Sequence, residues 1–268
     1  VQAYPDPDKK QVTLSMQLHG AKTAAFTLTG NVQFADEVIP VPVFQAQLEA
    51  DQNGRASVTI PLETVYYEWS EYQPALYFLL YQIDEQDNGF VSFGMRKFCA
   101  DGTRFTINGK PTMLRGKHDG MIFPLTGYAP TTVDEWLRVL KISRSYGMNH
   151  YRFHTCCPPE AAFIAADMLG IYMEPQLPFW GTIQAPGEEG FNEEEQNFLI
   201  AEGFRMLDAF GSHPSYCMMS MGNELWGSKE RLNEIIGAYK SRDSRHLYTQ
   251  GSNNFQWFQT SSRTTISS

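Results

Sequence analysis

The hydrophobic pattern of this chain changes at about residue 100, and the two parts require different classes of fold. In residues 1–100 apolar and polar residues alternate, as at Val12, Leu14 and Met16. A period of two is typical of half-buried strands, and turn signals such as Asp-Gln-Asn-Gly at 51–54 separate the alternating runs. The pattern predicts six or seven short strands packed as an all-β sandwich, which we interpret as a support module.

Residues 101–259 carry a different pattern, in which short apolar strands alternate with helical stretches. A Thr-x-x-Glu capping box at Thr132 predicts the start of a helix, Gly147 predicts its end, and Asn192 predicts the start of a later helix. A small hairpin with an Asn-Gly turn is expected at 108–109. Strands that are joined by helices form parallel sheets. We therefore expect five parallel strands joined by four helices, with the strands at 113–119, 148–154, 171–176, 216–221 and 246–250.

Residue types that bind sugars collect just after the ends of these strands. The carboxyl ends of parallel strands meet on one face, so we expect one cluster of polar and aromatic side chains there. Its members are His118, Asp119, Arg152, His154, Trp180, Asn223, Glu224 and the residues from Gln250 to Asn254. Polar groups can bind sugar hydroxyls, and aromatic rings can cover the apolar face of a pyranose. One alternative is that Asn223 caps a helix and Glu224 is a solvated acid in its first turn.

Composition and charge argue against several other functions. The net charge is −9 and the pI is about 5.2, with no basic cluster, which argues against nucleic acid as a partner. No apolar run reaches the ~20 residues that a membrane helix needs. No glycine-rich phosphate loop or dinucleotide fingerprint supports a generic α/β enzyme with a small substrate. We expect no cofactor.

The four cysteines form neither a CxxC pair nor a disulfide framework. Cys156 and Cys157 are adjacent and lie close to His154, so a metal site is one interpretation of this segment. Buried thiols in a loop are the interpretation that we favour, and we expect no metal.

A series of motifs in this chain resembles glycoside hydrolase family 2, which contains β-galactosidases, β-glucuronidases and β-mannosidases. Their order and spacing over residues 90–224 make the resemblance specific. They are Phe93-Gly-Met-Arg96, Phe105-Thr-Ile-Asn-Gly-Lys-Pro111, Leu114-Arg-Gly116, Asn149-His-Tyr-Arg152 with His154, Asp167-Met-Leu-Gly-Ile171 with Glu174, and His213-Pro-Ser215 followed by Gly222-Asn-Glu224. The family implies that residues 1–100 form an immunoglobulin-like sandwich. It implies that residues 101–259 form an incomplete (β/α)8 TIM barrel of about five βα units.

The resemblance also implies roles for the motif at 222–224, which matches the acid/base motif of the family. Glu224 would protonate the glycosidic oxygen in a retaining mechanism and later deprotonate the attacking water. Asn223 would hold the 2-hydroxyl of the sugar. Arg152 and His154 match positions that orient the carboxylates and the sugar, although a structural ion pair is equally open for Arg152.

Three further residues are candidates for substrate binding. Trp180 is either a sugar platform or a packed loop residue. His118 and Asp119 depart from the residues that the family usually carries after its first barrel strand, and we keep them as substrate-binding candidates.

The resemblance does not extend to the second catalytic carboxylate, the nucleophile, that members of this family carry. A retaining site needs a nucleophile about 5–5.5 Å from the acid/base, and the family supplies it from a later strand. Glu174 matches a family position that is not the nucleophile. We therefore expect a middle fragment of a β-galactosidase-like hydrolase of β-linked oligo- or polysaccharides, inactive by itself. A carbohydrate-binding or scaffold protein without catalysis is the alternative.

The last residues, 260–268, have no apolar period and are expected to form a polar tail. A shifted reading frame in the gene is an alternative origin for this segment. The resemblance favours a periplasmic or extracellular location. The sequence predicts neither the sugar nor the oligomeric state.

Overall fold

The computed structural model describes residues 1–85 and 87–254. Within these residues the chain forms two compact units. Unit 1 comprises Val1–Lys97, Ile107–Gly109 and Ser212–Pro214, and unit 2 comprises the other described residues. The predicted domain limits at residues 100 and 259 stay predictions, and the tail at 260–268 lies outside the described residues.

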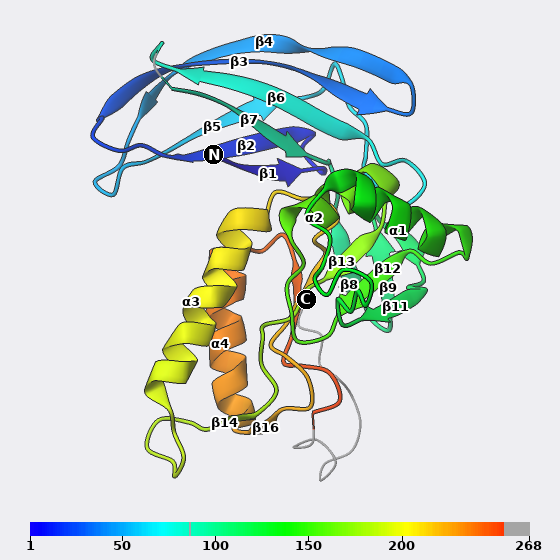
Figure 1. Cartoon of the computed structure of the whole chain (residues 1–268). Helices are drawn as coiled ribbons and strands as arrows, with labels where there is room; N and C mark the ends of the chain where they lie inside the picture. Colours follow the sequence, from blue (N-terminus) through cyan, green and yellow to red (C-terminus); the bar gives the residue numbers. More distant parts are fainter. Residues whose placement is uncertain (86, 255–268) are drawn as a thin grey trace. The chain divides into compact units, whose positions relative to one another are not determined.

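Unit 1 contains two antiparallel sheets with seven strands among its described residues (Figure 1). The smaller sheet has the order β1-β2-β5, with β1 at Gln2–Asp6, β2 at Gln11–Gln17 and β5 at Arg55–Pro61. The larger sheet has the order β4-β3-β6-β7, with β3 at Thr23–Phe34, β4 at Glu37–Glu49, β6 at Leu76–Ile83 and β7 at Asp87–Phe93. Apolar side chains of both sheets pack into one core, in which Val12, Leu14 and Met16 are buried as their alternation predicted.

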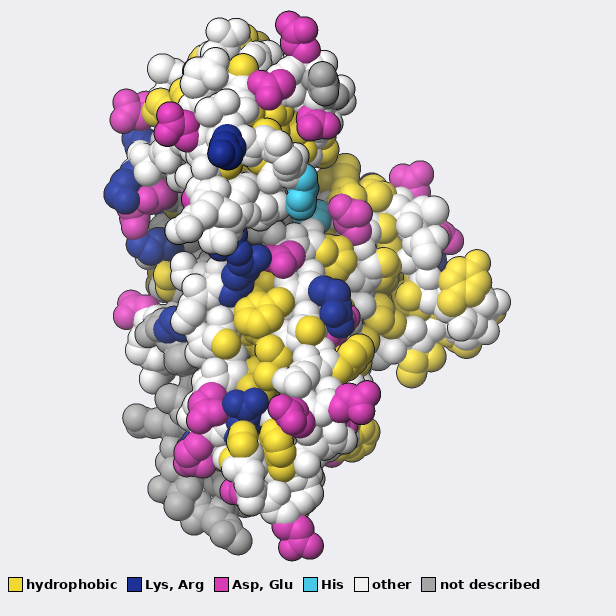
Figure 2. Space-filling view, turned by 90° about the vertical axis from the view of Figure 1, so that its left-hand side faces the viewer, with side chains coloured by type: hydrophobic (Ala, Val, Ile, Leu, Met, Phe, Trp, Pro, Cys, Tyr) yellow, Lys and Arg dark blue, Asp and Glu magenta, His cyan; other side chains and the backbone are white. Residues whose placement is uncertain are grey.

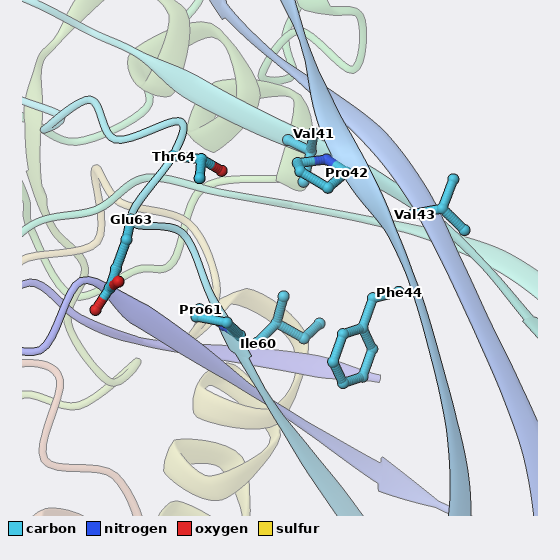
Figure 3. A pocket seen from close by; sticks show the side chains of 8 residues that line it. All are labelled: Val41, Pro42, Val43, Phe44, Ile60, Pro61, Glu63 and Thr64. Carbon is cyan, nitrogen blue, oxygen red and sulfur yellow. The ribbon is translucent and has the colours of Figure 1, made fainter.

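An apolar cavity of about 230 Å³ lies in unit 1 between β4 and the segment around the end of β5. Figure 3 shows Glu63 and Thr64 to one side of its apolar lining. The lining residues are Val41, Pro42, Val43, Phe44, Ile60, Pro61, Glu63 and Thr64. None of them is among the residues that the sequence predicts for a sugar site.

A three-stranded sheet follows in the chain, with the order β10-β9-β8. Its strands are β8 at Phe98–Asp101, β9 at Arg104–Ile107 and β10 at Lys110–Thr112. The turn between β9 and β10 has positive φ at both Asn108 (51°) and Gly109 (75°). Two positive φ values define the type I′ turn that an Asn-Gly pair favours, so the predicted hairpin is confirmed.

Five parallel strands form the part of unit 2 that matters for the site. They are β11 at Gly116–Asp119, β12 at His150–Phe153, β13 at Tyr172–Glu174, β15 at Met218–Ser220 and β17 at Leu247–Thr249. The first three form one parallel ladder, and β15 pairs with β17 in parallel. Parallel bridges at Met173–Tyr216 and Gln176–Ser220 connect the two groups. The short parallel strands β14 (Thr182–Ile183) and β16 (Trp226–Gly227) lie in the loops beyond them.

Helices connect these strands, as the sequence predicted: α1 at Val133–Ser145, α2 at Glu160–Leu169, α3 at Glu193–Phe210 and α4 at Lys229–Arg242. The side chain of Asn192 accepts a hydrogen bond from the N–H of Glu195 and caps α3 as expected. The capping box of α1 forms only in part. Thr132 is the N-cap, but its hydroxyl donates to the Glu135 carboxylate at 2.7 Å and caps no backbone N–H.

The strands of the parallel ladder have one apolar and one polar face. Tyr151, Phe153 and Met173 are fully buried in the core of unit 2, and burying a side chain of this size contributes roughly 1.5–3 kcal/mol. Arg152 and Glu174 alternate with them and therefore point to the other face. Parallel strands that are buried on both faces are usually apolar throughout, so this polar face is the first structural indication of a site.

Charged side chains of both signs are mixed on one face of the molecule (Figure 2). On the face shown in Figure 2, Lys and Arg side chains lie between Asp and Glu side chains and form no block of their own. None of the described helices has the length and apolar character needed to cross a membrane.

Candidate active site

Three strands bring a row of polar side chains together on the polar face of the ladder. In the parallel register His118 of β11 lies opposite Arg152 of β12, and Arg152 lies opposite Glu174 of β13. Residues in register on neighbouring strands point to the same face. Glu174 is only 9% exposed, and its Oε2 lies 3.3 Å from Nε2 of His150. The row therefore joins an imidazole, a guanidinium and a buried carboxylate.

Arg152 connects this row to the ends of two further strands. Its Nε donates to Oγ of Ser252, after β17, at 2.9 Å, and its Nη2 donates to Oδ1 of Asn223, after β15, at 2.7 Å. Its Nη1 lies 3.4 Å from Nδ1 of His118. Burial lowers the pKa of Arg152, and the charge of Glu174 opposes this effect. These contacts support the orienting role that the resemblance implies for Arg152.

Two glycines shape the strand ends that carry Asn223 and Ser252. Gly222 follows β15 and Gly251 follows β17, and both have a φ of 147°. A Cβ atom at Gly222 would lie 2.3 Å from the carbonyl oxygen of Phe179, which is too close for any side chain. Beyond the glycines the chains pair again through a parallel bridge, and the N–H of Ser252 donates to the oxygen of Gly222 at 3.1 Å.

Glu224 lies in a β-bulge and has a left-handed backbone, with φ 52°. The N–H groups of Asn223 and Trp226 donate to the oxygens of Phe179 and Gly181, at 3.2 and 3.0 Å. Between these two hydrogen bonds the segment 223–226 advances by three residues, whereas the neighbouring segment 179–181 advances by two. The extra residue defines the bulge. A left-handed glutamate costs roughly 1–2 kcal/mol, and strain of this kind concentrates at functional sites.

The carboxylate of Glu224 is partly exposed and accepts a hydrogen bond from Nδ2 of Asn253 at 3.2 Å. Its backbone N–H donates to the oxygen of Ser252 at 2.7 Å. The next residue, Leu225, is fully buried, whereas Glu224 is only half-buried. The backbone is therefore fixed while the carboxylate stays accessible.

The side-chain amide of Asn223 is oriented by Arg152. Because Oδ1 accepts from the guanidinium, Nδ2 faces the other way. Within the described part of the chain Nδ2 makes no hydrogen bond, so it can donate to a ligand hydroxyl. The alternative in which Asn223 caps a helix is wrong, because the side chain of Ser228 caps α4.

His154, which follows β12, forms an aromatic group with His118 and Trp180. The ring centroids are 4.9 Å apart for His118 and His154, and 5.6 Å apart for His154 and Trp180. Burial lowers the pKa of His154, the charges of His118 and Arg152 lower it further, and Glu224 opposes them. Its Nδ1 is buried without a hydrogen bond to the described residues. The indole of Trp180 is 61% exposed, so this group presents both a polar nitrogen and a ring face.

Asp119 is engaged in a different set of contacts. Its carboxylate accepts from Nζ of Lys117 at 2.8 Å and from the N–H of Met121 at 2.6 Å. It is the neighbour of His118 in β11 and so points to the opposite face of the strand. These contacts favour a structural role at the start of the loop after β11. Its part in sugar binding stays a prediction that these contacts do not support.

The adjacent cysteines have the properties of protonated thiols. Burial raises the pKa of Cys156 to about 11 and also raises that of Cys157, so neither is a ready metal ligand or nucleophile at neutral pH. Across residues 1–85 and 87–254, no group of three or more His, Cys, Asp or Glu side chains is arranged to hold a metal ion.

Ser252 lies in the cluster, as expected for residues 250–254, and Gln176 joins it although its sequence position did not indicate a site residue. Nε2 of Gln176 donates to Oγ of Ser252 at 3.3 Å, and its Oε1 accepts from the N–H of Thr155 at 2.9 Å. A usable signal exists in the sequence. The segment 249–252, Thr-Gln-Gly-Ser, has the same form as 220–223, Ser-Met-Gly-Asn, in which a glycine follows a strand and precedes a polar residue.

Two curated proteins named β-galactosidase are similar to most of this chain. The one from Priestia megaterium (strain DSM 319 / IMG 1521) is 23% identical over 257 residues, which cover 91% of this chain and 23% of that protein. The one from Oenococcus oeni (strain ATCC BAA-331 / PSU-1) is 24% identical over 247 residues, which cover 82% of this chain and 22% of that protein. No family model matches the chain.

Solved structures match the fold over the same length. A glycosyl hydrolase family 2 member from Bacteroides cellulosilyticus has a TM-score of 0.71 at 19% identity, covering 91% of this chain and 32% of that chain. The β-glucuronidase of Parabacteroides merdae has a TM-score of 0.69 at 19% identity, covering 92% of this chain and 32% of that chain. The chain resembles glycoside hydrolase family 2.

This family-2-like chain spans less than a quarter of the length of the two curated relatives. The resemblance stated from the motifs alone is confirmed by these similarities. At 18–20% identity the solved structures establish the likeness of fold, and the chemistry of this chain has to be argued from its own side chains.

Proposed function

We propose that this family-2-like chain carries the acid/base half of a retaining glycosidase site for β-linked oligo- or polysaccharides. The observation that carries the proposal is the set of hydrogen bonds by which Arg152 holds the strand ends at Asn223 and Ser252 beside Glu224. The names of the relatives, β-galactosidase and β-glucuronidase, support glycoside hydrolysis in general.

Glu224 is the general acid and base in this proposal. As the glycosidic C–O bond breaks, its carboxylic acid gives its proton to the departing oxygen, and its carboxylate later takes a proton from the attacking water. Asn223 donates through Nδ2 to the sugar 2-hydroxyl. Arg152 positions that amide, and His154 and Trp180 contact the same sugar, with His118 beside them.

We also propose the finer fold assignment, an immunoglobulin-like sandwich at 1–100 and the first part of a (β/α)8 barrel at 101–259. The division of the first seven strands into facing sheets of three and four supports the sandwich. Five parallel strands in chain order, joined by helices, support the barrel. Barrel enzymes carry their catalytic groups at the carboxyl ends of the strands, which is where the Arg152 contacts lie.

The proposed mechanism also needs a nucleophile, and the described carboxylates near Glu224 do not suit that role. Glu174 is buried beside His150, and Asp119 is bound to Lys117. We therefore propose that the chain by itself turns over no glycoside, although its acid/base site is formed.

An external nucleophile tests Glu224 independently of the second carboxylate. Azide can attack the anomeric carbon of a bound aryl β-glycoside, so that a C–N bond forms, the bond to the aryl oxygen breaks and Glu224 protonates that oxygen. With phenyl β-glycosides, whose leaving group needs a proton, we expect glycosyl azide from the wild-type chain and about 10²–10⁴ less from Glu224→Gln. With dinitrophenyl glycosides, which leave without a proton, the two proteins should react alike.

Glu230→Gln is the matched control, because Glu230 is an exposed glutamate in the first turn of α4. Substrates with galactose, glucuronic acid and mannose should be tested in parallel. If the phenyl glycosides react equally well with Glu224→Gln, the acid/base assignment is wrong. Hydrolysis without azide that disappears in Glu224→Gln would show a nucleophile within the chain.

Carbohydrate binding without catalysis is the second candidate. The exposed indole of Trp180 beside the imidazole of His154 favours it, because such a surface binds a sugar without any proton transfer. This candidate expects unchanged sugar affinity in Glu224→Gln and no glycosyl azide from phenyl glycosides.

A further inference from the structure

The hydroxyl oxygen of Ser252 accepts hydrogen bonds from two side chains. Nε of Arg152 donates to Oγ of Ser252 at 2.9 Å, and Nε2 of Gln176 donates to the same oxygen at 3.3 Å. A guanidinium has no acceptor. The orientation of the Gln176 amide is fixed by its oxygen, which accepts from the N–H of Thr155 at 2.9 Å, so its nitrogen faces Ser252. In both contacts Ser252 is therefore the acceptor.

These two bonds determine where the proton of the Ser252 hydroxyl points. A hydroxyl has two lone pairs and one hydrogen, and the two N–H groups occupy both lone pairs. The hydrogen must therefore point away from both donors. In the part of the chain that the structure describes, this hydroxyl donates to no acceptor, and the Ser252 side chain is only half-buried. The proton is therefore available to a ligand.

Arg152 also holds this hydroxyl beside the amide of Asn223. Its Nε donates to Ser252, and its Nη2 donates to Oδ1 of Asn223 at 2.7 Å. These two N–H groups form one edge of the rigid guanidinium fork, and their hydrogen bonds run nearly parallel. A parallel bridge between Asn223 and Ser252 joins the two strand ends as well. The Ser252 hydroxyl and Nδ2 of Asn223 are thus neighbouring donors that face away from the guanidinium.

Two donors that lie side by side fit two oxygens on adjacent carbons of one sugar. In the proposed function Asn223 donates to the 2-hydroxyl. The oxygens next to it on a pyranose are the glycosidic oxygen and the 3-hydroxyl. Because Glu224 gives its proton to the glycosidic oxygen, the 3-hydroxyl is the neighbour that remains for Ser252.

We propose that Ser252 is a substrate-binding residue that donates its proton to the oxygen of the sugar 3-hydroxyl, and that Arg152 and Gln176 hold it in this donor role. The inference rests on the proposed function of Glu224 and Asn223. Because Asn223 and Ser252 offer only donors to the ligand, they select for a sugar with an acceptor oxygen at both positions. A 3-deoxy sugar leaves the Ser252 proton without a partner.

Deoxy sugars and Ser252→Ala together form a cycle that isolates this one contact. The probes are the methyl β-glycosides of galactose, glucuronic acid and mannose, each with its 3-deoxy and 4-deoxy derivatives, and NMR titration of the complete chain measures their affinities. For the sugar that binds, we expect the 3-deoxy derivative to bind the wild-type chain about five- to tenfold more weakly than the parent. Ser252→Ala should bind these two glycosides equally well. The 4-deoxy derivative should lose the same factor in both proteins.

Two further variants separate the donor role of Ser252 from a structural one. Ser252→Thr retains a hydroxyl and should again discriminate against the 3-deoxy sugar. Ser57→Ala, at an exposed position of β5, is the matched control and should behave like the wild-type chain. A purely structural role of Ser252 would make Ser252→Ala bind all the glycosides more weakly by one factor, with the ratio of parent to 3-deoxy affinity unchanged.

Two kinds of outcome would overturn the inference in distinguishable ways. If Ser252→Ala keeps the wild-type ratio of parent to 3-deoxy affinity, or if the ratio changes for the 4-deoxy derivative instead, Ser252 does not bind the 3-hydroxyl, while the sugar site at Asn223 and Glu224 stands. If the wild-type chain binds none of the parent glycosides, the proposed sugar site is wrong and the role of Ser252 is wrong with it.

Discussion

The backbone of Glu224 is in a conformation that a glutamate adopts only when its neighbours hold it there. Its φ is 52°, and hydrogen bonds to the loops after β13 and β17 enclose it on both sides. Residues at functional sites often carry such strain because the position of the side chain matters more than local stability. The strain itself can be measured.

Replacement of Glu224 by glycine should leave the chain more stable than replacement by alanine. Both changes remove the carboxylate, but only glycine has no Cβ penalty at a positive φ. We expect Glu224→Gly to exceed Glu224→Ala by about 1 kcal/mol in the free energy of unfolding, measured in urea. Equal stabilities would show that the left-handed backbone at this position is not strained.

His154 should titrate below the ordinary histidine pKa of about 6.5. Burial is the main cause, and the charges of His118 and Arg152 add to it. Because the unfolded chain then binds more protons, the contribution of His154 to stability is complete above about pH 6.5 and decreases as the pH falls toward the lowered pKa. Histidine NMR signals give the pKa directly.

The variant Arg152→Gln tests whether the charge of Arg152 contributes to the lowered pKa of His154. Removal of the guanidinium charge should raise the pKa of His154, although burial should keep it below the ordinary value. Arg138→Gln on the exposed face of α1 is the control and should have no effect. A wild-type His154 that titrates at or above pH 6.5 would contradict the expectation.

Among the elements, the strands and helices were predictable, but the details that build the site were not. Alternation at Val12 and Leu14 and the caps at Asn192 and Gly147 depend on near neighbours in the chain, so sequence patterns identify them. The two-residue strands β14 and β16 carry no pattern of their own. The bond between Arg152 and Ser252 spans 100 residues, and nothing local in either segment indicates it.

For the predicted site residues too, the sequence indicated which residues meet but not the details that depend on distant segments. His118, Arg152, His154, Trp180 and Asn223 are joined by contacts, as expected from strand ends that share one face. Strand alternation turns Asp119 to the face of β11 opposite His118. This could have been predicted from the sequence only with knowledge of where the regular pairing of β11 ends. The left-handed φ of Glu224 arises from a bulge that only the pairing of distant loops creates.

Gly222 at the end of β15 should tolerate no side chain. Gly222→Ala brings a Cβ atom to 2.3 Å from a backbone oxygen that cannot move freely, so we expect a loss of about 2 kcal/mol or more in unfolding free energy. Gly237→Ala in α4 is the matched control. Its Cβ would meet nothing within 4 Å, and the higher helix propensity of alanine should raise stability by about 0.5–1 kcal/mol.

At the scale of the whole chain, the two units are interleaved in sequence. Unit 1 includes Ile107–Gly109 and Ser212–Pro214 besides the first 97 residues. The N–H of Ala3 donates to Oγ of Ser212 at 3.0 Å, and Nε of Arg96 donates to the oxygen of Pro214 at 3.0 Å. Without these later segments, the seven strands of unit 1 therefore lose some of the hydrogen bonds formed within their own unit.

A polypeptide of residues 1–97 should consequently be less stable than unit 1 in the complete chain. Each lost hydrogen bond contributes roughly 0.5–1.5 kcal/mol, and the groups left behind need water as a substitute. Hydrogen exchange of the β6 amides measures the difference within the strands themselves. Equal protection in the short and complete chains would show that the later segments add no stability.

The interleaving also has a consequence for synthesis on the ribosome. Pro214 lies 118 positions after Arg96, so at roughly 5–20 residues per second it is made on the order of ten seconds later. The strands of unit 1 can pair early, but the contacts of Ala3 and Arg96 have to wait until α1, α2 and α3 have been translated. During that interval the seven strands of unit 1 lack these contacts and stay open to rearrangement and to chaperones.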